Sequence, residues 1–274
     1  MNKSIAVAVF AYNRPSHLKR VLMSIENSKI SNDIYLFIDG PKNYKDKLNQ
    51  KYIRLQAENF KSKNKFIVVQ KKKNFGLAKS IMNGISQLSK KYYAIIVLED
   101  DTVPYKNFFQ YMFFCIKNFY NNKDIGAICS FQFSNFTNLR FNQLILLNNF
   151  ITWGWAIHSK KWQDFLNFKK KNTNKFDLDK TIYKKIWRKT NNRNIWSLSF
   201  IKYNMLKKKK FIFPSSSLIK NVGFDGSGTN SKLSDKLIVK NENKINKFKK
   251  KLIDKKSYQT KHEKKLKKLI DLFY

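Results

Sequence analysis

Short apolar runs alternate with helical patterns along the first hundred residues of the chain. After the first run, Leu18, Val21, Leu22 and Ile25 recur at the spacing of one helix face. Strands that alternate with helices four times predict an α/β fold, with a mainly parallel sheet, helices on both faces and right-handed crossovers. The apolar runs lie at residues 5–11, 34–38, 66–69 and 93–98, and further helices are predicted at 44–60 and 77–88.

The pattern becomes less regular after residue 101. From residue 235 onward the chain is mostly Lys, Asn and Ile, with Lys at 14 positions. A weak apolar stripe predicts an amphipathic C-terminal tail that either packs on the body or lies on a membrane surface. The stripe comprises Ile253, Leu266, Leu269, Ile270 and Phe273. Before the tail, helices are predicted at 104–120, 160–168, 178–189 and 197–206, short strands at 125–130, 144–147, 152–157 and 211–214, and a loop at 221–230.

Three acids follow the fourth apolar run directly. Residues 95–98 are all bulky and apolar, which is typical of a strand buried on both faces of a parallel sheet. Glu99, Asp100 and Asp101 then lie at the carboxyl end of that strand, where open α/β sheets bind ligands. Adjacent carboxylates repel one another unless a cation lies among them, and hard divalent cations prefer oxygen ligands. The pattern therefore indicates a metal site, although a simple acidic turn would give it too.

The chain is strongly basic, with 56 Lys and Arg against 18 Asp and Glu and a formal net charge of +38. Such a charge suits a polyanionic partner. Only six of the basic residues are Arg, and Asn, Ile and Phe are abundant, as AT-rich codon usage produces. Proteins that recognise nucleic acid favour Arg, because its guanidinium makes bidentate contacts. We therefore attribute the charge to composition and to attraction toward anionic membranes, and we do not expect a nucleic-acid partner.

The composition indicates a folded cytoplasmic protein. The 274 residues are 42% hydrophobic and 15% aromatic, which suffices for a large core. Cys115 and Cys129 lie in apolar contexts without metal-ligand spacing, as reduced core residues do. No run approaches the roughly 20 apolar residues that span a bilayer. Residues 5–12 lead into Asn-Arg-Pro without a small-residue cleavage site, so we expect a strand there and not a signal peptide.

Six short motifs occur in a distinctive order and resemble bacterial family 2 glycosyltransferases and, more distantly, the N-acetylglucosaminyltransferase I type. The resemblance implies the GT-A fold, a nucleotide-sugar donor, most simply a UDP-sugar, and Mn²⁺ or Mg²⁺ as cofactor. It implies a glycosyltransferase domain at 1–234, with a nucleotide-binding half at 1–101 and an acceptor half at 102–234, and it leaves 235–274 as a Lys-rich helical tail. The motifs are Ala-Tyr-Asn-Arg-Pro at 11–15, Phe-Ile-Asp-Gly-Pro at 37–41, Asn-Phe-Gly-Leu at 74–77, Leu-Glu-Asp-Asp at 98–101, Trp-Gly-Trp-Ala at 153–156 and Asn-Val-Gly-Phe-Asp-Gly at 221–226.

The resemblance assigns roles to the acidic motif. Asp101 would bind the metal, Asp100 would face the ribose or sugar hydroxyls of the donor, and Glu99 would support catalysis at the site. The ion would bridge the two phosphates of the donor and offset the charge that builds on the leaving nucleoside diphosphate.

Three further residues follow neighbouring strands at the same rim. Arg14 could reach the base, the ribose or a phosphate of the donor, or it is simply a surface residue. Asp39 could accept the N–H of a uracil-type base, or it belongs to an ordinary Asp-Gly-Pro turn. Asn74 opens a helix whose backbone N–H groups favour anions, although helix capping by Asn74 explains the residue equally well.

Two tryptophans flank a glycine at Trp153, Gly154 and Trp155. In the resembled families this stretch lines the pocket for the donor sugar and the acceptor. Aromatic faces suit the apolar faces of sugar rings, and a glycine lets the backbone come close to a ligand. Core packing is the alternative, because Trp is usually well buried.

The chain departs from the resembled pattern at the catalytic base. Many relatives have an Asp at the position of Ser197 and a His at that of Asn230. A serine cannot act as a base without help. Inverting transfer to a hydroxyl needs a carboxylate, or an equivalent base, opposite the leaving group. We expect Asp225 to serve, because its Gly-flanked loop can move, and Asp177 and Asp179 are the alternatives.

The sequence thus predicts a metal-dependent glycosyltransferase, inverting by resemblance, that acts on a glycan or lipid-linked saccharide in cell-surface polysaccharide or lipopolysaccharide synthesis. The site would face the cytoplasm, and tail residues 236–268 would hold the enzyme on anionic lipid. A sugar nucleotidyltransferase is one rival, but the first strand is not followed by a Gly-rich phosphate loop. A non-catalytic glycan- or polyanion-binding relative is the other, since Ser197 and Asn230 replace residues of the active site.

Overall fold

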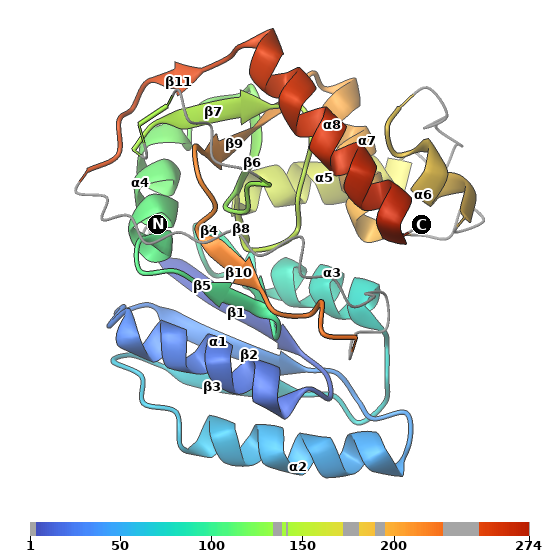
Figure 1. The fold of residues 1–274 in the computed structure, drawn as a ribbon. Coiled ribbons are helices and arrows are strands. Elements are labelled where there is room, and N and C mark those ends of the chain that lie inside the picture. The colour runs from blue at the N-terminus through green and yellow to red at the C-terminus, as the bar shows by residue number, and fades with distance from the viewer. Residues whose placement is uncertain are drawn as a thin grey trace.

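The computed structural model describes residues 4–133, 139–140, 142–171, 181–189, 195–226 and 247–273. Within these ranges, nine strands form one mixed, mainly parallel sheet in the order β11-β7-β9-β6-β8-β4-β1-β2-β3, with helices on both faces (Figure 1). Strands β10 and β5 pair separately as a short antiparallel ribbon. The expected α/β class is confirmed.

The elements agree with the sequence pattern to within a few residues, except for three very short strands, β5, β10 and β11, that the pattern did not predict. The strands are β1 (Ile5–Ala11), β2 (Asp33–Ile38), β3 (Phe66–Gln70), β4 (Ala94–Glu99), β5 (Thr102–Pro104), β6 (Ile125–Cys129), β7 (Leu144–Leu147), β8 (Trp155–His158), β9 (Lys210–Pro214), β10 (Ile219–Asn221) and β11 (Leu252–Ile253). The helices are α1 (Pro15–Asn27), α2 (Tyr44–Glu58), α3 (Leu77–Leu88), α4 (Phe108–Phe119), α5 (Ser159–Lys171), α6 (Lys184–Lys189), α7 (Trp196–Leu206) and α8 (Lys256–Phe273).

The parallel half of the sheet consists of β1 to β4. Strand β1 lies between β2 and β4, so that Phe10 is opposite both Phe37 and Glu99. Alternate residues of β1 point into two separate cores: Val7 and Val9 face α1, α2 and α4, whereas Phe10 faces α3. Burial on both faces explains why β1 and β4 are continuously apolar. The parallel pairing of β1 with β4 brings the carboxyl ends of both strands to one edge of the sheet.

The second half of the sheet joins the first through β8, which runs antiparallel to both β4 and β6. Strand β9 then lies between β6 and β7, parallel to β6 and antiparallel to β7. Helices α5 and α7 cover the same face as α3 and enclose an aromatic core around Trp155, Trp162 and Phe200. The ribbon of β5 and β10 connects the end of β4 to the chain after β9.

The described part of the C-terminal segment belongs to the folded body. Strand β11 pairs in parallel with β7, and α8 packs against β7 and α6 (Figure 1). Four inward residues of α8 recur every four positions, and of these Leu266 and Ile270 are only 5% and 3% exposed. Of the two alternatives for the stripe, the structure shows packing on the body for Leu266 and Ile270, whereas the side chains of Leu269 and Phe273 lie outside those described. The inward residues are Tyr258, His262, Leu266 and Ile270.

His262 links α8 to the chain that follows β6. Its ring lies 5.1 Å from that of Phe133 and 5.0 Å from that of Phe213, measured between centroids. Its Nδ1 lies 3.1 Å from Oε1 of Gln132. Burial lowers the pKa of His262 to about 3, so the ring is neutral near pH 7. The helix therefore carries an uncharged histidine inward and its lysines outward.

Replacing Leu266 by alanine is expected to destabilise the protein by about 2–5 kcal/mol, because it removes a buried side chain and leaves a cavity under α8. Urea denaturation followed by tryptophan fluorescence measures the loss. Lys267→Ala is the matched control on the exposed side of the same helix, and it should stay within about 0.5 kcal/mol of the original protein. Equal stabilities for the two variants would mean that α8 does not dock through its apolar face.

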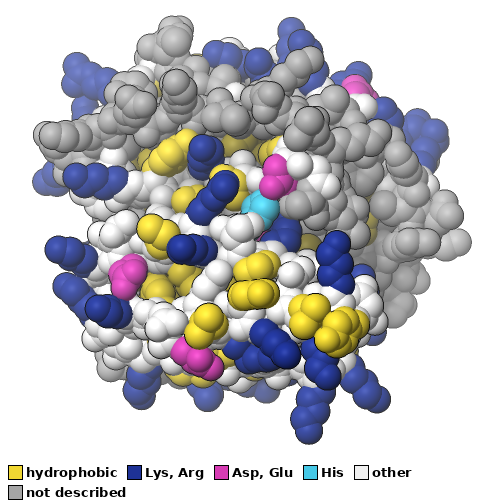
Figure 2. Space-filling view, turned by 60° about the horizontal axis from the view of Figure 1, so that its bottom comes forward, with side chains coloured by type: hydrophobic (Ala, Val, Ile, Leu, Met, Phe, Trp, Pro, Cys, Tyr) yellow, Lys and Arg dark blue, Asp and Glu magenta, His cyan; other side chains and the backbone are white. Residues whose placement is uncertain are grey.

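Basic side chains are spread widely over the surface. On the face shown in Figure 2, Lys and Arg side chains are scattered among apolar and uncharged ones instead of forming a continuous patch. This face therefore shows no continuous basic patch of the kind that marks a nucleic-acid footprint. None of the helices in the described ranges has the length and apolar character required to cross a bilayer.

Candidate active site

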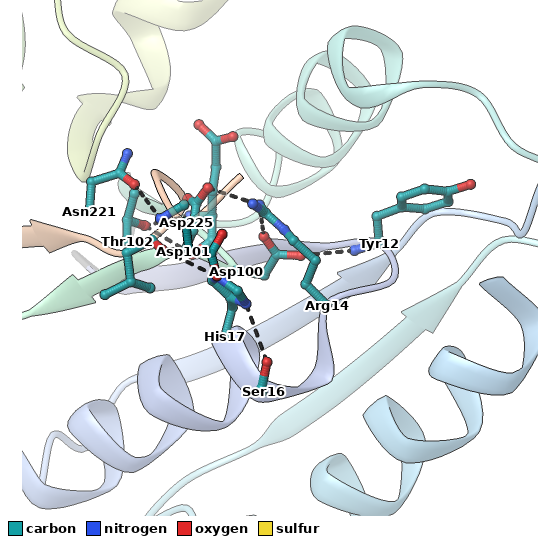
Figure 3. Close-up of polar contacts among 12 residues, drawn as sticks. Tyr12, Arg14, Ser16, His17, Asp100, Asp101, Thr102, Asn221 and Asp225 are labelled. Atoms are coloured by element: carbon teal, nitrogen blue, oxygen red, sulfur yellow. Dashed lines mark hydrogen bonds and ion pairs between the residues drawn. The ribbon is translucent and has the colours of Figure 1, made fainter. Parts of the chain in front are cut away.

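The candidate site lies where the carboxyl ends of β1 and β4 meet. Arg14 immediately precedes α1, and Asp100 and Asp101 immediately follow β4. Pro15 fixes the first turn of α1, where it is favoured because it has no N–H to leave unpaired. The short connection from β1 into α1 thereby directs the side chain of Arg14 toward the acids (Figure 3). The structure thus brings together Arg14 and the acidic motif, as the sequence predicted.

One guanidinium nitrogen joins the two aspartates. Nη2 of Arg14 donates to Oδ1 of Asp100 and, at 2.8 Å, to Oδ2 of Asp101 (Figure 3). The other oxygen of Asp100 accepts the backbone N–H of Tyr12 at 3.3 Å. Asp100 is buried, whereas the side chain of Asp101 is 15% exposed. Asp101 is therefore the acid of this pair that a ligand can reach from solvent.

The cluster holds more negative charge than Arg14 neutralises. Burial raises the pKa of Glu99 to about 8, and the nearby Asp101 and Asp100 add to the shift. Burial also raises the pKa of Asp100 to about 6, although the Arg14 guanidinium opposes the rise. Burial lowers the pKa of Arg14, but Asp100 and Asp101 more than offset that effect and hold it above its ordinary value. A further cation at this edge would relieve the repulsion among the carboxylates.

The acidic cluster fits a hard divalent cation. Because Nη2 of Arg14 contacts both aspartates, a single positive centre can be shared by them. The oxygen donors suit Mg²⁺ or Mn²⁺, which in such sites take one or two carboxylates together with substrate phosphates. Within the described residues, no three His, Cys, Asp or Glu side chains are grouped as a complete metal site. Among the described residues, Asp101 with Asp100 beside it could therefore hold such an ion together with ligands from outside this group, such as substrate phosphates or water.

The loop that follows β10 lies against the acids. Val222 donates its backbone N–H to the carbonyl of Asp101 at 2.8 Å. A Cβ atom on Gly223 would lie only 2.3 Å from Oδ2 of Asp101 and 3.2 Å from Nη1 of Arg14, so only glycine lets the loop approach this closely. Phe224 then packs on Trp153, with 5.2 Å between ring centroids. Residues 221–226 thus form one wall of the site.

Asp225, the expected base, is held by a histidine that the sequence analysis did not assign to the site. Nε2 of His17 lies 3.0 Å from Oδ2 of Asp225 and 3.2 Å from the carbonyl oxygen of Val222 (Figure 3). His17 is buried, whereas the side chain of Asp225 is 48% exposed. The signal for His17 was its spacing: it follows Arg14 by three positions, so both lie on the same side of the first turn of α1.

Asp46 is a second residue that the sequence analysis missed. It accepts hydrogen bonds from the hydroxyl of Tyr12 and, at 2.6 Å, from the side-chain amide of Asn13. Although burial acts to raise it, these hydrogen bonds hold the pKa of Asp46 below its usual range. Asn43 caps the N-terminus of α2 by accepting the N–H of Asp46. The start of α2 therefore fixes the loop that carries Arg14.

Asp39 and Asn74 hold two neighbouring loops together. The carboxylate of Asp39 is buried and accepts the backbone N–H groups of Phe75 at 2.9 Å and Gly76 at 2.8 Å. Asn74 donates its side-chain amide to the carbonyl of Gly40 at 2.8 Å. The N-cap of α3 is Gly76, so the capping alternative for Asn74 is wrong. In this structure, Asp39 and Asn74 therefore stabilise the rim by joining its two loops through hydrogen bonds.

The three residues of the Trp-Gly-Trp motif have different surroundings. Trp155 is wholly buried and stacks on Trp196 at 5.4 Å, so the prediction that its ring meets a sugar is corrected: it belongs to the core. Gly154 has a φ of +64°, and a Cβ there would lie 2.6 Å from Ile219. Trp153 is only partly buried and contacts Phe224. Of the two indole rings, only that of Trp153 is at the site.

Comparison with known families decides the assignment. The sequence model of glycosyl transferase family 2 matches residues 6–182, which include β1 to β8 and the acidic motif. The chain belongs to glycosyl transferase family 2. It is thus a glycosyltransferase with a GT-A-like fold that transfers a sugar from a nucleotide-sugar donor. The comparisons give no support for the similarity to N-acetylglucosaminyltransferase I.

Solved structures resemble this family 2 chain only weakly. They include 4-diphosphocytidyl-2C-methyl-D-erythritol synthase from Anaerococcus prevotii, at 10% identity and a TM-score of 0.41 over 70% of this chain and 85% of that one. Glucosyl-3-phosphoglycerate synthase from Mycobacterium tuberculosis, in complex with Mn²⁺, UDP and glucosyl-3-phosphoglycerate, is 10% identical and gives a TM-score of 0.37 over 58% of each chain. A putative nucleotide-diphospho-sugar transferase from Desulfovibrio desulfuricans is 7% identical and gives a TM-score of 0.39 over 76% of this chain and 78% of that one. No curated protein matches the chain.

Ser197 lies in the first turn of α7, next to the buried Trp196, where many family 2 relatives have the catalytic Asp. The remaining residues of the base hypothesis, Asp177, Asp179 and Asn230, lie outside the described residues. Asp225 is therefore the acceptor-side candidate that the described structure places beside the acidic cluster.

Proposed function

We propose that this family 2 glycosyltransferase uses a UDP-sugar and Mn²⁺ or Mg²⁺ to glycosylate a hydroxyl of a glycan or lipid-linked saccharide with inversion. The observation that carries the proposal is the convergence of Arg14, Asp100 and Asp101 at one sheet edge, beneath the wall formed by residues 221–226. Cationic groups and carboxylates at this edge suit a diphosphate and its ion.

The donor would lie along the rim of β1, β2 and β4. Asp101 would hold the ion, which offsets charge on the leaving nucleoside diphosphate. Arg14 would bind the diphosphate or ribose. Asp100, which is buried with its oxygens bonded to Arg14 and Tyr12, would orient Arg14 instead of facing the ribose or sugar hydroxyls as the resemblance implies. Glu99, at the end of β4, would support the site from behind Asp101. Asp39 and Asn74 would act on the nucleotide chiefly by fixing the loop at 74–76, whose backbone forms that side of the rim.

The acceptor would enter on the side of residues 221–226. The half-buried ring of Trp153 would pack on a sugar ring, with Gly154 allowing the backbone its close turn. Asp225 would accept the proton of the attacking hydroxyl, and His17 would hold the carboxylate in place through Nε2. Transfer then requires the hydroxyl to approach from the side opposite the diphosphate.

Hydrolysis and transfer assays with a panel of nucleotide sugars test the proposal. We expect slow hydrolysis of one UDP-sugar in the presence of Mn²⁺ and its loss when EDTA is added. Transfer to a saccharide acceptor should then be faster than hydrolysis. Binding of a nucleotide sugar without any turnover would favour the non-catalytic relative instead, and turnover that is indifferent to EDTA would remove the metal from the proposal.

We also propose that the exposed side of α8 holds the enzyme at the anionic cytoplasmic surface of a membrane, in the synthesis of cell-surface polysaccharide or lipopolysaccharide. Because the inner stripe of α8 packs on the body, attraction would come from charge and not from insertion. A shallow concavity is lined by five lysines and one acid, and that acid, Asp271, is paired with Lys185 at 3.0 Å. The lysines are Lys261, Lys264, Lys265, Lys267 and Lys268.

Replacing Lys264, Lys265 and Lys268 by glutamine is expected to weaken binding to phosphatidylglycerol vesicles by about 100-fold, since each lysine near an anionic surface contributes about 1 kcal/mol. Vesicle co-sedimentation measures binding, which added salt should also weaken. The matched control replaces three lysines of α2 with the same change in charge. Equal losses for both triple variants would show that net charge, and not this surface, attracts the lipid. The control positions are Lys45, Lys47 and Lys51.

A further inference from the structure

The position between Asp100 and Asp101 is already filled by a positive group. Nη2 of Arg14 is within hydrogen-bonding distance of both carboxylates, and the ion pair with Asp101 measures 2.8 Å. The side chain of Arg14 is 19% exposed, so these interactions are poorly screened by water. Charge-assisted hydrogen bonds of this kind are among the stronger ones in proteins. The guanidinium is therefore a firmly held counter-ion of the acids.

The surroundings of Arg14 leave little room for a second cation beside it. Gly223 lies so close that a Cβ atom there would be 3.2 Å from Nη1 of Arg14 and 2.3 Å from Oδ2 of Asp101. The backbone of Val222 is tied to the carbonyl of Asp101 at 2.8 Å, which holds the loop in that place. A divalent ion that took Oδ2 of Asp101 at about 2.1 Å would sit within a few ångströms of the guanidinium, and the two like charges would repel each other.

We propose that Arg14 is the resident cation of the acidic cluster and that a divalent ion binds Asp101 only by displacing its guanidinium. The inference rests on the proposed function for the identity of the ion, but its basis is the contact of one nitrogen with two carboxylates. When the ion displaces the guanidinium from Asp101, Arg14 stays paired with Asp100, and its Nη2 no longer donates to Asp101. Arg14 is thus a positioning residue that sets how tightly the site takes metal before the donor arrives.

Titration of the ligand-free protein with Mn²⁺ alone tests this inference, with unbound Mn²⁺ measured by electron paramagnetic resonance. Arg14→Gln is expected to bind Mn²⁺ about tenfold more tightly than the original protein, since the ion no longer competes with a charged hydrogen bond. Arg14→Lys should fall between them, because an ammonium keeps the charge but cannot reproduce the planar fork of guanidinium. Arg20→Gln, on the exposed side of α1, is the control and should leave Mn²⁺ affinity unchanged.

Thermal unfolding supplies a second readout that does not depend on activity. Without metal, Arg14→Gln should melt below the original protein, because the buried Asp100 loses its counter-ion, and saturating Mn²⁺ should raise its melting temperature more than it raises that of the original. Mn²⁺ affinity that is equal or weaker in Arg14→Gln, with measurable binding to the original protein, would overturn the inference and leave the proposed function standing. Absence of Mn²⁺ binding in both proteins, with and without UDP, would overturn both.

Discussion

Replacing Asp101 by asparagine is expected to lower the rate of metal-dependent sugar transfer by about 10³-fold, because the ion's stabilisation of charge on the leaving diphosphate amounts to several kcal/mol. Asparagine has nearly the same shape, and the hydrogen bond from Val222 goes to the backbone carbonyl of residue 101, which the substitution keeps. The fold should therefore be preserved. Arg14 also keeps its second partner, Asp100. Initial rates with the UDP-sugar at several Mn²⁺ concentrations measure the effect.

The control for this variant is Glu58→Gln, which neutralises an exposed acid at the end of α2 without touching the site. It should transfer sugar at the original rate. Calorimetry should show weaker binding of Mn²⁺ and of UDP to Asp101→Asn, with an unchanged far-ultraviolet circular dichroism spectrum. Retention of both affinities and of the transfer rate would show that Asp101 is not the metal ligand.

Asp225→Asn is expected to reduce kcat by about 10²–10⁴-fold, which is the usual contribution of a positioned general base. The amide keeps the size of the side chain and its contact with His17, but it cannot accept the proton of the acceptor hydroxyl. KM for the donor should change little if Asp225 acts on the acceptor side, as we propose. Steady-state kinetics with a saccharide acceptor measure the change in kcat and in KM.

His17 provides the companion variant. His17→Ala should lower kcat about tenfold through the loss of one positioning hydrogen bond. His17→Gln, which retains a donor, should recover part of the rate. If Asp225→Asn keeps full activity, the base is elsewhere, and Asp177 and Asp179 become the residues to replace next.

The parallel half of the fold was predictable because its signals are local. A strand buried on both faces must be apolar throughout, so β1 and β4 can be recognised from six or seven consecutive residues of sequence. The position of the acids after β4 then follows from chain direction alone. Arg14 could be placed at the same edge for the same reason, since it comes directly after the parallel neighbour of β4.

The contacts that complete the site were not predictable because they join distant segments. Gly223 touches Asp101 only because β10 pairs with β5, and two strands of three residues carry no periodic signal. His17 meets Asp225 through the same pairing. Trp155 shows the opposite error: a sugar-binding interpretation was attached to a residue whose surroundings, across β6 and α7, make it part of the core. The residue type alone could not distinguish these two roles of Trp155, whereas its contacts in the folded structure do.

The strand order also determines the route by which the chain folds. Strand β1 pairs with β2, and β2 with β3, across a single helix each, whereas Leu252 of β11 must find Leu144 of β7 across several intervening strands and helices. Pairings between distant segments form late, because closing a longer loop costs more entropy. The edge of β7 and the apolar surface beneath α8 consequently stay uncovered until the last stage of folding. We therefore expect a partly folded chain in which α8 has not yet docked to be the species most prone to aggregate, because the edge of β7 and this apolar surface are then exposed.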